Sequence, residues 1–226
     1  MVDSGTSTGA AGTVGILCAL PEELGELRDF RVGVREGHGL EILELSIEGV
    51  EALACVGGVG KVLAARAATR LITEGAERAL LCVGVCGGLK RDMPAGTLVH
   101  CERAVQSDSA IRQTREVTPE PVLLEAWSEV VPGRRGFFLT ADRPAISPWR
   151  RMRLARAYLG SPVADMETAS AALVARSSGV PWAALRAVTD GVWRGGSTAF
   201  KEHYPAQAGR AADTIPALLR RSAWLS

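Results

Sequence analysis

The chain has 226 residues, which suffices for one large α/β domain and is short for two. A net charge of +1 gives no overall field that would attract a nucleic acid or an anionic membrane. No segment approaches the roughly 18 apolar residues that cross a bilayer, and residues 1–13 lack the basic start and apolar core of a secretion signal. We therefore expect a cytoplasmic protein with a flexible tail at 1–13 and a single domain at 14–226.

The cysteines and histidines indicate neither a disulfide nor a metal site. The cysteines are odd in number, lack paired spacing and fall in strand-like segments or at strand ends: Cys18, Cys55, Cys82, Cys86 and Cys101. They are typical of buried small apolar residues in a reducing compartment. Cys86, in a glycine-rich turn, could alternatively be a nucleophile. The three histidines lack the spacing of metal ligands, so no metal site is predicted.

The first predicted strand ends at a possible functional acid. Residues 13–20 form a short apolar run that predicts a buried strand. Pro21 then opens a helix, because proline suits the first turn and the acidic Glu22 and Glu23 complement the positive end of the helix dipole. Capping alone could explain Glu23. Its place at the end of a strand also allows a functional role.

A meander and a glycine-rich turn follow. Alternating apolar and polar residues across glycine-containing turns predict antiparallel strands at 30–35, 40–48 and 50–56. Residues 57–61, Gly-Gly-Val-Gly-Lys, then open a strong helix at 62–73. They are not a phosphate-binding P-loop, which needs a glycine where Cys55 stands and a hydroxyl residue where Val62 stands. The turn more simply lets the helix approach the sheet, although its amides could also contact an anion.

The middle of the chain contains its most hydrophobic segment. Residues 78–85 predict the central strand, and residues 86–89, Cys-Gly-Gly-Leu, predict a turn without side chains that would bar a ligand. Further predicted elements are a strand pair at 95–105, a polar loop at 106–121, helices at 122–131 and 147–159, a strand at 136–141 and a closing amphipathic helix at 206–219. Four arginines between positions 149 and 156 alternate with apolar residues, and we interpret them as a solvated helix face.

One stretch places acidic residues just after two predicted strands. The pattern predicts a strand-helix-strand unit of parallel type at 161–164, 168–178 and 182–188. Asp165 and Glu167 follow the first strand, and Asp190 follows the second. Open parallel sheets bind ligands beyond the carboxyl ends of their strands, so these acids are expected to border one crevice. Alternatively, each could be a helix cap or a turn residue.

With these elements placed, the chain resembles the nucleoside phosphorylase and nucleosidase superfamily, especially its hydrolases of methylthioadenosine and S-adenosylhomocysteine. Five motifs carry the likeness in order and spacing: Gly-Ile-Leu-Cys-Ala-Leu-Pro-Glu-Glu at 15–23, Gly-Gly-Val-Gly-Lys-Val at 57–62, Val-Gly-Val-Cys-Gly-Gly-Leu at 83–89, Asp-Met-Glu-Thr at 165–168 and Arg-Ala-Val-Thr-Asp at 186–190. Each motif alone is weak evidence for the family, but five of them in the right order and spacing are strong evidence. The resemblance implies an α/β fold: a single-domain, three-layer sandwich whose central mixed, largely parallel sheet is flanked by helices.

The resemblance also implies catalytic roles for four residues. Glu23 would activate water, and Asp190 would donate a proton to purine N7. Glu167 would hold the ribose diol, while Arg186 would fix the water and the carboxylates. Breaking an N-glycosidic bond develops positive charge on the ribose and negative charge on the departing base, which carboxylates and a proton on N7 respectively stabilise. One acid must then stay protonated while another is ionised.

Further residues are implied to bind the substrate. Met166 would pack against sugar and base, and Phe200 falls where the family has an aromatic wall. The remaining candidates lie near the base-site turn or beside the acidic motifs: Val85, Cys86, Gly87, Pro144, Asp165 and Thr189. Asp190 suits a 6-aminopurine, because one carboxyl oxygen can donate to N7 while the other accepts from the amino group.

Water is the expected nucleophile. Phosphorylases of this superfamily hold phosphate with arginines and a hydroxyl group, whereas here Val85 stands at the hydroxyl position and Cys82 where one arginine would be. Glu23 would also oppose a phosphate dianion, since like unit charges about 4 Å apart repel by on the order of 4 kcal/mol at an effective dielectric of about 20. A phosphorylase is the alternative.

Departures from the methylthioadenosine hydrolases leave the 5′ substituent open. Those enzymes usually have Glu where Asp165 stands and Ser where Val85 stands, and they carry a base-stacking aromatic residue near Pro144. Asp-Met-Glu at 165–167, together with Ala-Asp-Arg-Pro-Ala at 141–145, is more similar to the branch associated with hopanoid synthesis, which removes adenine from adenosylhopane. Adenosylhopane or another specialised nucleoside is therefore an alternative substrate.

The main hypothesis is an N-ribosyl hydrolase that needs no cofactor and releases adenine from a 5′-substituted adenosine. A catalytically silent nucleoside-binding protein is the alternative from a different class, and the intact Glu23, Glu167 and Asp190 argue against it. A dinucleotide-dependent oxidoreductase lacks its glycine fingerprint. Superfamily members pair so that a neighbour completes the substrate pocket, so the resemblance also implies a homodimer.

Overall fold

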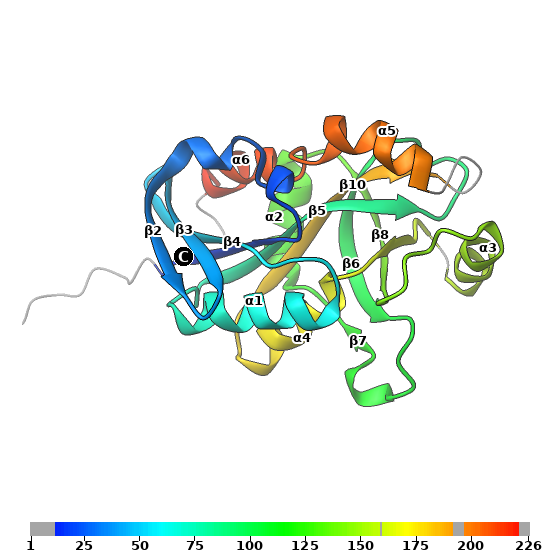
Figure 1. Cartoon of the computed structure of the whole chain (residues 1–226), viewed down its shortest axis with the longest axis horizontal. Coiled ribbons are helices and arrows are strands. Elements are labelled where there is room, and N and C mark those ends of the chain that lie inside the picture. Colours follow the sequence, from blue (N-terminus) through cyan, green and yellow to red (C-terminus); the bar gives the residue numbers. More distant parts are fainter. Residues whose placement is uncertain (1–11, 159, 192–196, 222–226) are drawn as a thin grey trace, which may run out of the picture.

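A ten-stranded sheet forms the centre of the molecule (Figure 1). The computed structural model describes residues 12–158, 160–191 and 197–221, so the tail predicted at 1–13 lies almost wholly outside the described residues. The strands are β1 (Val14–Cys18), β2 (Arg31–Gly37), β3 (Leu40–Ile47), β4 (Val50–Val56), β5 (Ala79–Gly88), β6 (Leu98–Gln106), β7 (Glu116–Val117), β8 (Arg134–Thr140), β9 (Val163–Asp165) and β10 (Trp182–Asp190). They lie in the order β10-β6-β8-β9-β5-β1-β4-β3-β2, with β7 paired to β6.

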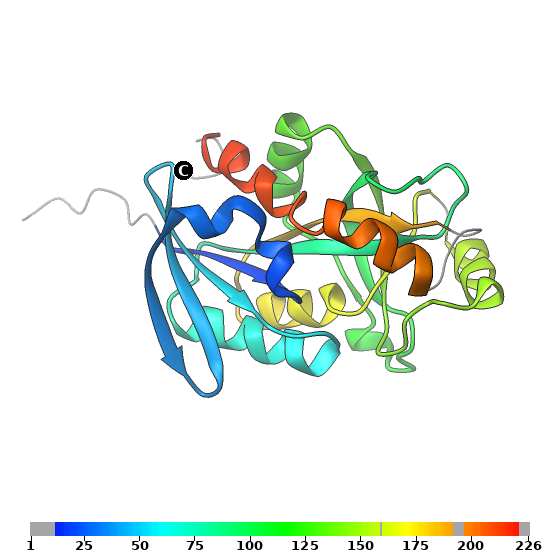
Figure 2. The same cartoon turned by 45° about the horizontal axis from the view of Figure 1, so that its top comes forward.

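Helices cover both faces of this sheet (Figures 1 and 2). One face carries α1 (Lys61–Thr73) and α4 (Thr168–Ser177), and the other carries α2 (Pro121–Val130), α5 (Ser197–Gln207) and α6 (Ile215–Leu219). The helix α3 (Pro148–Ala157) stands at one end of the sheet, and 3-10 turns form η1 (Pro21–Phe30), η2 (Arg112–Thr114) and η3 (Ala212–Thr214). The predicted α/β sandwich with a mixed central sheet between helices is confirmed.

The sheet is buried on both faces because its central strands are apolar throughout. In β5, Leu80 and Cys82 pack in the cluster that includes α1 and α4, whereas Leu81 and Val83 pack in the cluster that includes α2 and α6. This alternation follows the two-residue period of a strand. β5 has parallel neighbours, β1 and β10, which confirms residues 78–85 as the central strand.

The sheet closes on itself around the end of β5. β10 pairs with both β5 and β6, so strands β5, β10, β6, β8 and β9 form a ring. β10 runs parallel to β5 and β9 antiparallel to it, so the predicted parallel strand-helix-strand unit is wrong. The carboxyl ends of β9 and β10 nevertheless meet, because Ala164 and Asp190 are both paired with Gly87.

Several other predicted elements differ in extent. Residues 86–88 extend β5 instead of leaving it as a turn, because β9 and β10 pair with them. The strand pair predicted at 95–105 is the single strand β6, and the predicted loop at 106–121 contains η2 and β7.

The closing helix predicted at 206–219 is divided among α5, η3 and α6. The interruption includes Gly209, where an added Cβ would lie 2.6 Å from the Cα of Gly25. The close packing of these two backbones requires a residue without a side chain, and the helical pattern breaks there. No helix in the described part of the chain is long and apolar enough to span a membrane.

Candidate active site

A pocket of about 290 Å³ opens where β1, β5, β9 and β10 reach their carboxyl ends. This is close to the lower end of the range typical of small-molecule sites. All the residues proposed from the sequence as catalytic or substrate-binding contribute to its lining: Glu23, Val85, Cys86, Gly87, Pro144, Asp165, Met166, Glu167, Arg186, Thr189, Asp190 and Phe200. The fold therefore brings together residues from six separate parts of the chain.

Glu23 both caps a helix and reaches the central strand. Its Oε2 accepts hydrogen bonds from the amides of Ala19 (2.8 Å) and Leu20 (3.1 Å), and its Oε1 accepts one from the amide of Val85 (2.9 Å). Glu23 therefore caps η1 and also lines the pocket. Burial raises the pKa of the Glu23 carboxyl, while Arg186 and the three amides oppose this rise.

Gly84 makes the approach of Glu23 to β5 possible. Its φ is +141°, and a Cβ built on it would lie 2.5 Å from Oε1 of Glu23. Both the backbone angle and the lack of space favour glycine at this position. The absence of a side chain at Gly84 therefore leaves room for the Glu23 carboxylate to lie against the central strand.

Arg186 is the positive centre of the acidic cluster. Its side chain is 1 % exposed, and its guanidinium lies 3.3 Å from Oδ2 of Asp165 and 3.2 Å from Oε2 of Glu167. Its Nη1 also donates to the carbonyl of Val85 (3.0 Å). A buried arginine compensates for neighbouring carboxylates, and removing one partner of such a cluster leaves an uncompensated buried charge.

Glu167 links this cluster to the glycine-rich turn. The amide of Gly60 donates to its Oε1 (3.0 Å). The amide at this helix start therefore binds the carboxylate of Glu167, an anion within the protein. Burial raises the pKa of Glu167 to about 7, and the nearby Asp165 adds to the rise while Arg186 opposes it. Glu167 can therefore change protonation state near neutral pH.

Asp165 has mainly a supporting position. The hydroxyl of Thr140 donates to its Oδ1, and the amide of Thr168 donates to its Oδ2 (3.1 Å), as in the helix-cap alternative considered for this residue. Oδ2 also faces Arg186. Since both oxygens are engaged by the protein, Asp165 holds Arg186 and the start of α4 in place.

Asp190 is paired with an arginine that the sequence interpretation placed in solvent. Arg151 is 4 % exposed, and its Nη2 donates to Oδ2 of Asp190 while its Nη1 donates to the carbonyl of Gly191 (2.8 Å). The solvated-face interpretation of the arginine run is wrong for this residue. A signal was present in the sequence, because Arg151 shares its helix face with Leu154, at i+3, and Ala155, at i+4, which pack against the core.

The hydroxyl of Thr189 can form a hydrogen bond with Asp190 whether or not the carboxyl group is protonated. Its hydroxyl lies 2.8 Å from Oδ1 of Asp190 and 3.2 Å from the carbonyl of Cys86. A hydroxyl has a single proton, which it donates to Oδ1 when that oxygen is unprotonated. When Oδ1 carries a proton, the Thr189 hydroxyl can accept a hydrogen bond from it and donate its own proton to the carbonyl of Cys86 instead.

The structure does not favour Cys86 as a nucleophile. Its side chain is buried, and burial raises the pKa of its thiol, whereas a nucleophilic cysteine needs an accessible thiolate. Within the described ranges, no group of three or more His, Cys, Asp or Glu side chains is arranged to hold a metal ion.

The sequence of the chain is similar to that of a known family and its members. Residues 13–222 match the family model described as the phosphorylase superfamily. The chain is 25% identical over 220 residues to the 5′-methylthioadenosine/S-adenosylhomocysteine nucleosidase of Mycobacterium bovis, covering 80% of this chain and 86% of that protein. It is 28% identical over 219 residues to the enzyme of the same name from Treponema pallidum, covering 79% and 81%.

Solved structures share the fold at low sequence identity. The futalosine hydrolase of Helicobacter pylori superposes with a TM-score of 0.86 at 21% identity, covering 93% of this chain and 98% of that one. The 5′-methylthioadenosine/S-adenosylhomocysteine nucleosidase of Helicobacter pylori also gives 0.86 at 21% identity, covering 94% and 99%. These likenesses confirm the fold.

Replacing Glu167 by Gln should change how stability depends on pH. Its folded-state pKa, about 7, lies above its ordinary value of 4.5, so the folded state holds this proton more tightly. The contribution of Glu167 to the free energy of unfolding therefore falls as pH rises from about 4.5 to about 7, by at most about 3.5 kcal/mol at about 1.4 kcal/mol per pKa unit. Urea unfolding from pH 5 to pH 8 should show Glu167→Gln gaining stability relative to the wild type.

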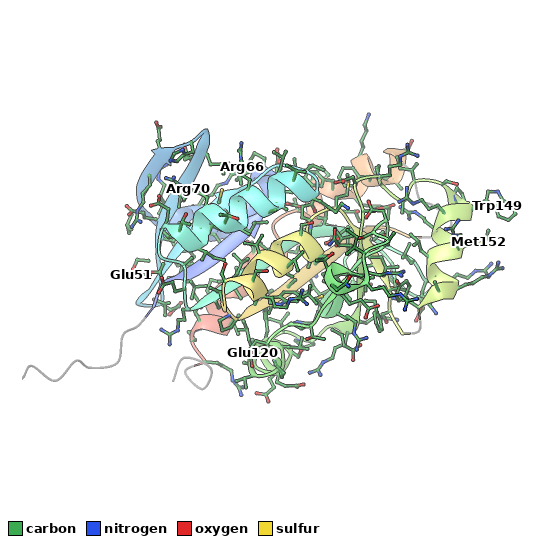
Figure 3. The ribbon with its side chains drawn as sticks, turned by 90° about the horizontal axis from the view of Figure 1, so that it is seen from below. Glu51, Arg66, Arg70, Glu120, Trp149 and Met152 are labelled. Carbon is green, nitrogen blue, oxygen red and sulfur yellow. The ribbon has the colours of Figure 1, made fainter. Side chains whose placement is uncertain are left out.

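Glu51→Gln is the control, because Glu51 is exposed on β4, away from the pocket (Figure 3). Its difference from the wild type should stay constant across this pH range. A constant difference for Glu167→Gln as well would mean that the Glu167 carboxyl is ionised throughout.

Proposed function

Because the chain belongs to the phosphorylase superfamily, we propose that it is a purine nucleosidase that hydrolyses the N-glycosidic bond of a 5′-substituted adenosine. The proposal rests on one observation: three buried acids, Glu23, Glu167 and Asp190, line a single pocket together with the buried cation Arg186. The names of the curated relatives, which are nucleosidases of two 5′-substituted adenosines, support this class of substrate.

In the proposed reaction, Glu23 and Glu167 act on the sugar side. Glu23 accepts a proton from the attacking water, and its raised pKa makes it a better base than an exposed carboxylate. Glu167 accepts hydrogen bonds from the ribose hydroxyls. Both carboxylates stabilise the positive charge that develops on the ribose ring as the bond to the base breaks.

Asp190 acts on the base side. Oδ2 is held by Arg151, which leaves Oδ1 as the oxygen that donates a proton to purine N7. Thr189 can stabilise Oδ1 with or without that proton. The electron pair of the breaking bond passes to the purine, and the proton on N7 neutralises it, so that the neutral base leaves.

Water is favoured over phosphate by the charges already present. The guanidinium of Arg186 is paired with Asp165 and Glu167, and the adjoining Glu23 would repel a dianion. A phosphate-binding site needs cations that are not already compensated. The charges around Arg186 therefore support hydrolysis.

Purine release from a panel of nucleosides tests the proposal. We expect adenine to be released from at least one of methylthioadenosine, S-adenosylhomocysteine, adenosine and 5′-deoxyadenosine, at equal rates with and without phosphate. Liquid chromatography of the products measures both the base and the sugar. Strict dependence on phosphate would identify a phosphorylase, and binding without any release would favour the nucleoside-binding alternative.

Asp190→Asn should lower kcat by at least about a hundredfold, the usual scale of general acid catalysis, with a much smaller effect on substrate binding. The amide fills the same space and still contacts Arg151 and Thr189, but it has no acidic proton to transfer. Steady-state kinetics and calorimetric binding measure the two effects separately. Asp92→Asn is the matched control, since Asp92 is exposed and pairs with Arg134 outside the pocket. Turnover near the wild-type rate would place the proton donor elsewhere.

We also propose that two copies associate over the mouth of the pocket. Val59, Val62 and Leu63, on the glycine-rich turn and the first turn of α1, are 44%, 78% and 37% exposed, and Val59 lines the pocket. Neighbouring exposed apolar residues are typical of protein interfaces. A second copy seated there would shield the substrate from water.

Val62→Glu should therefore shift the protein from dimer to monomer in sedimentation velocity experiments and lower its activity. A charge at the centre of an apolar contact opposes burial. Val32→Glu is the matched control, because Val32 is 71% exposed but lies on the edge strand β2 and does not line the pocket. A wild-type protein that sediments as a monomer at micromolar concentration would contradict the dimer.

A further inference from the structure

We propose that Arg151 determines base specificity, allowing the pocket to bind a 6-oxopurine as well as a 6-aminopurine. The inference deepens the proposed function and depends on it. Arg151 was not among the residues identified from the sequence motifs, yet it lies in the pocket lining beside the acid that contacts the base.

The guanidinium of Arg151 is fixed in place on several sides. Its Nε donates to the carbonyl of Ala145, and its Nη1 donates to the carbonyl of Gly191. On the same helix Trp149 is 79% exposed and points outward (Figure 3), whereas Arg151 turns inward and is buried. A side chain held this way presents its remaining donors in a defined direction.

One donor of Arg151 is left for a ligand. Nη2 carries two hydrogens, and among the described residues only Oδ2 of Asp190 accepts from it. Gly87 lies against this nitrogen, where an added Cβ would be 3.1 Å from Nη2. Because Gly87 has no side chain, the space beside Nη2 stays open to the pocket.

The two purine classes differ at the edge that faces this pair. A 6-aminopurine presents an acceptor at N7 and a donor at its amino group, whereas a 6-oxopurine presents acceptors at both N7 and O6. A carboxyl group alone can satisfy the first pattern: Oδ1 of Asp190 donates to N7, and Oδ2 accepts from the amino group. Opposite O6, the same Oδ2 would place two acceptors against each other.

Arg151 supplies the donor that O6 requires. Nη2 and Oδ2 are in direct contact, so an acceptor and a donor lie side by side where the C6 substituent arrives. Guanidinium groups are the side chains that most often recognise the O6 and N7 edge of guanine. The amino group of one class would thus bind Oδ2 and the oxo group of the other would bind Nη2, while N7 uses Oδ1 in both.

Two nucleosides that differ only at C6, 5′-deoxyadenosine and 5′-deoxyinosine, test this assignment, with adenosine and inosine as a second pair. We expect the wild type to release both bases. In Arg151→Met, kcat/KM for the 6-oxo member should fall at least tenfold relative to the 6-amino member, in keeping with about 1 to 3 kcal/mol for a base contact. Arg151→Lys keeps a donor and should retain most of the 6-oxo activity. Arg153→Met, on the exposed side of the same helix, should leave the ratio unchanged.

Other results would overturn the inference. Release of adenine but never hypoxanthine by the wild type would show that Arg151 does not admit an oxo group. A fall of both activities by the same factor in Arg151→Met would show a purely supporting role. If Arg151→Met fails to fold, calorimetry of the wild type with free hypoxanthine and free adenine decides, because the inference requires both to bind. Release of no purine from either pair, nor from methylthioadenosine or S-adenosylhomocysteine, would instead contradict the proposed function.

Discussion

The buried ion pairs between Arg186 and the carboxylates of Asp165 and Glu167 are the interactions on which the site depends. Carboxylates without a cation would lose much of their hydration on burial and would be driven to take up protons. Arg186 is positioned by β10, where it pairs with Gly84 of β5 and Val99 of β6. The ring of strands thus places one positive charge beside the end of β9, which delivers two negative ones.

Two arginines divide the pocket into regions of different chemistry. Arg186 compensates the acids on the proposed sugar side, and Arg151 compensates Asp190 on the proposed base side. The carboxyl groups consequently lie in distinct environments, and burial raises the pKa of Glu167 to about 7. Separation of environments is how a set of similar acids can carry out different steps of one reaction.

The functional candidates also stabilise the local structure. Glu23 caps η1, Asp165 caps α4, and the backbone of Gly60 at the start of α1 binds Glu167. The structural and functional interpretations of these acids are therefore compatible. A substitution at any of them is expected to affect both folding and chemistry, which is why isosteric changes are the informative ones.

The α/β class, the central apolar strand and the acids that follow strand ends could be predicted from the sequence, because they depend on local periodicity and on short motifs. The sequence did not determine the direction of β9, since a three-residue strand has no pattern that tells parallel from antiparallel pairing. Nor did it reveal the partner of Arg151, which lies 39 residues away at Asp190. Helical spacing can place an arginine on a buried face, but only the tertiary structure, which brings α3 near Asp190 at the end of β10, decides which charge it meets there. Such contacts arise from the closure of the sheet, and no local pattern in the chain encodes that closure.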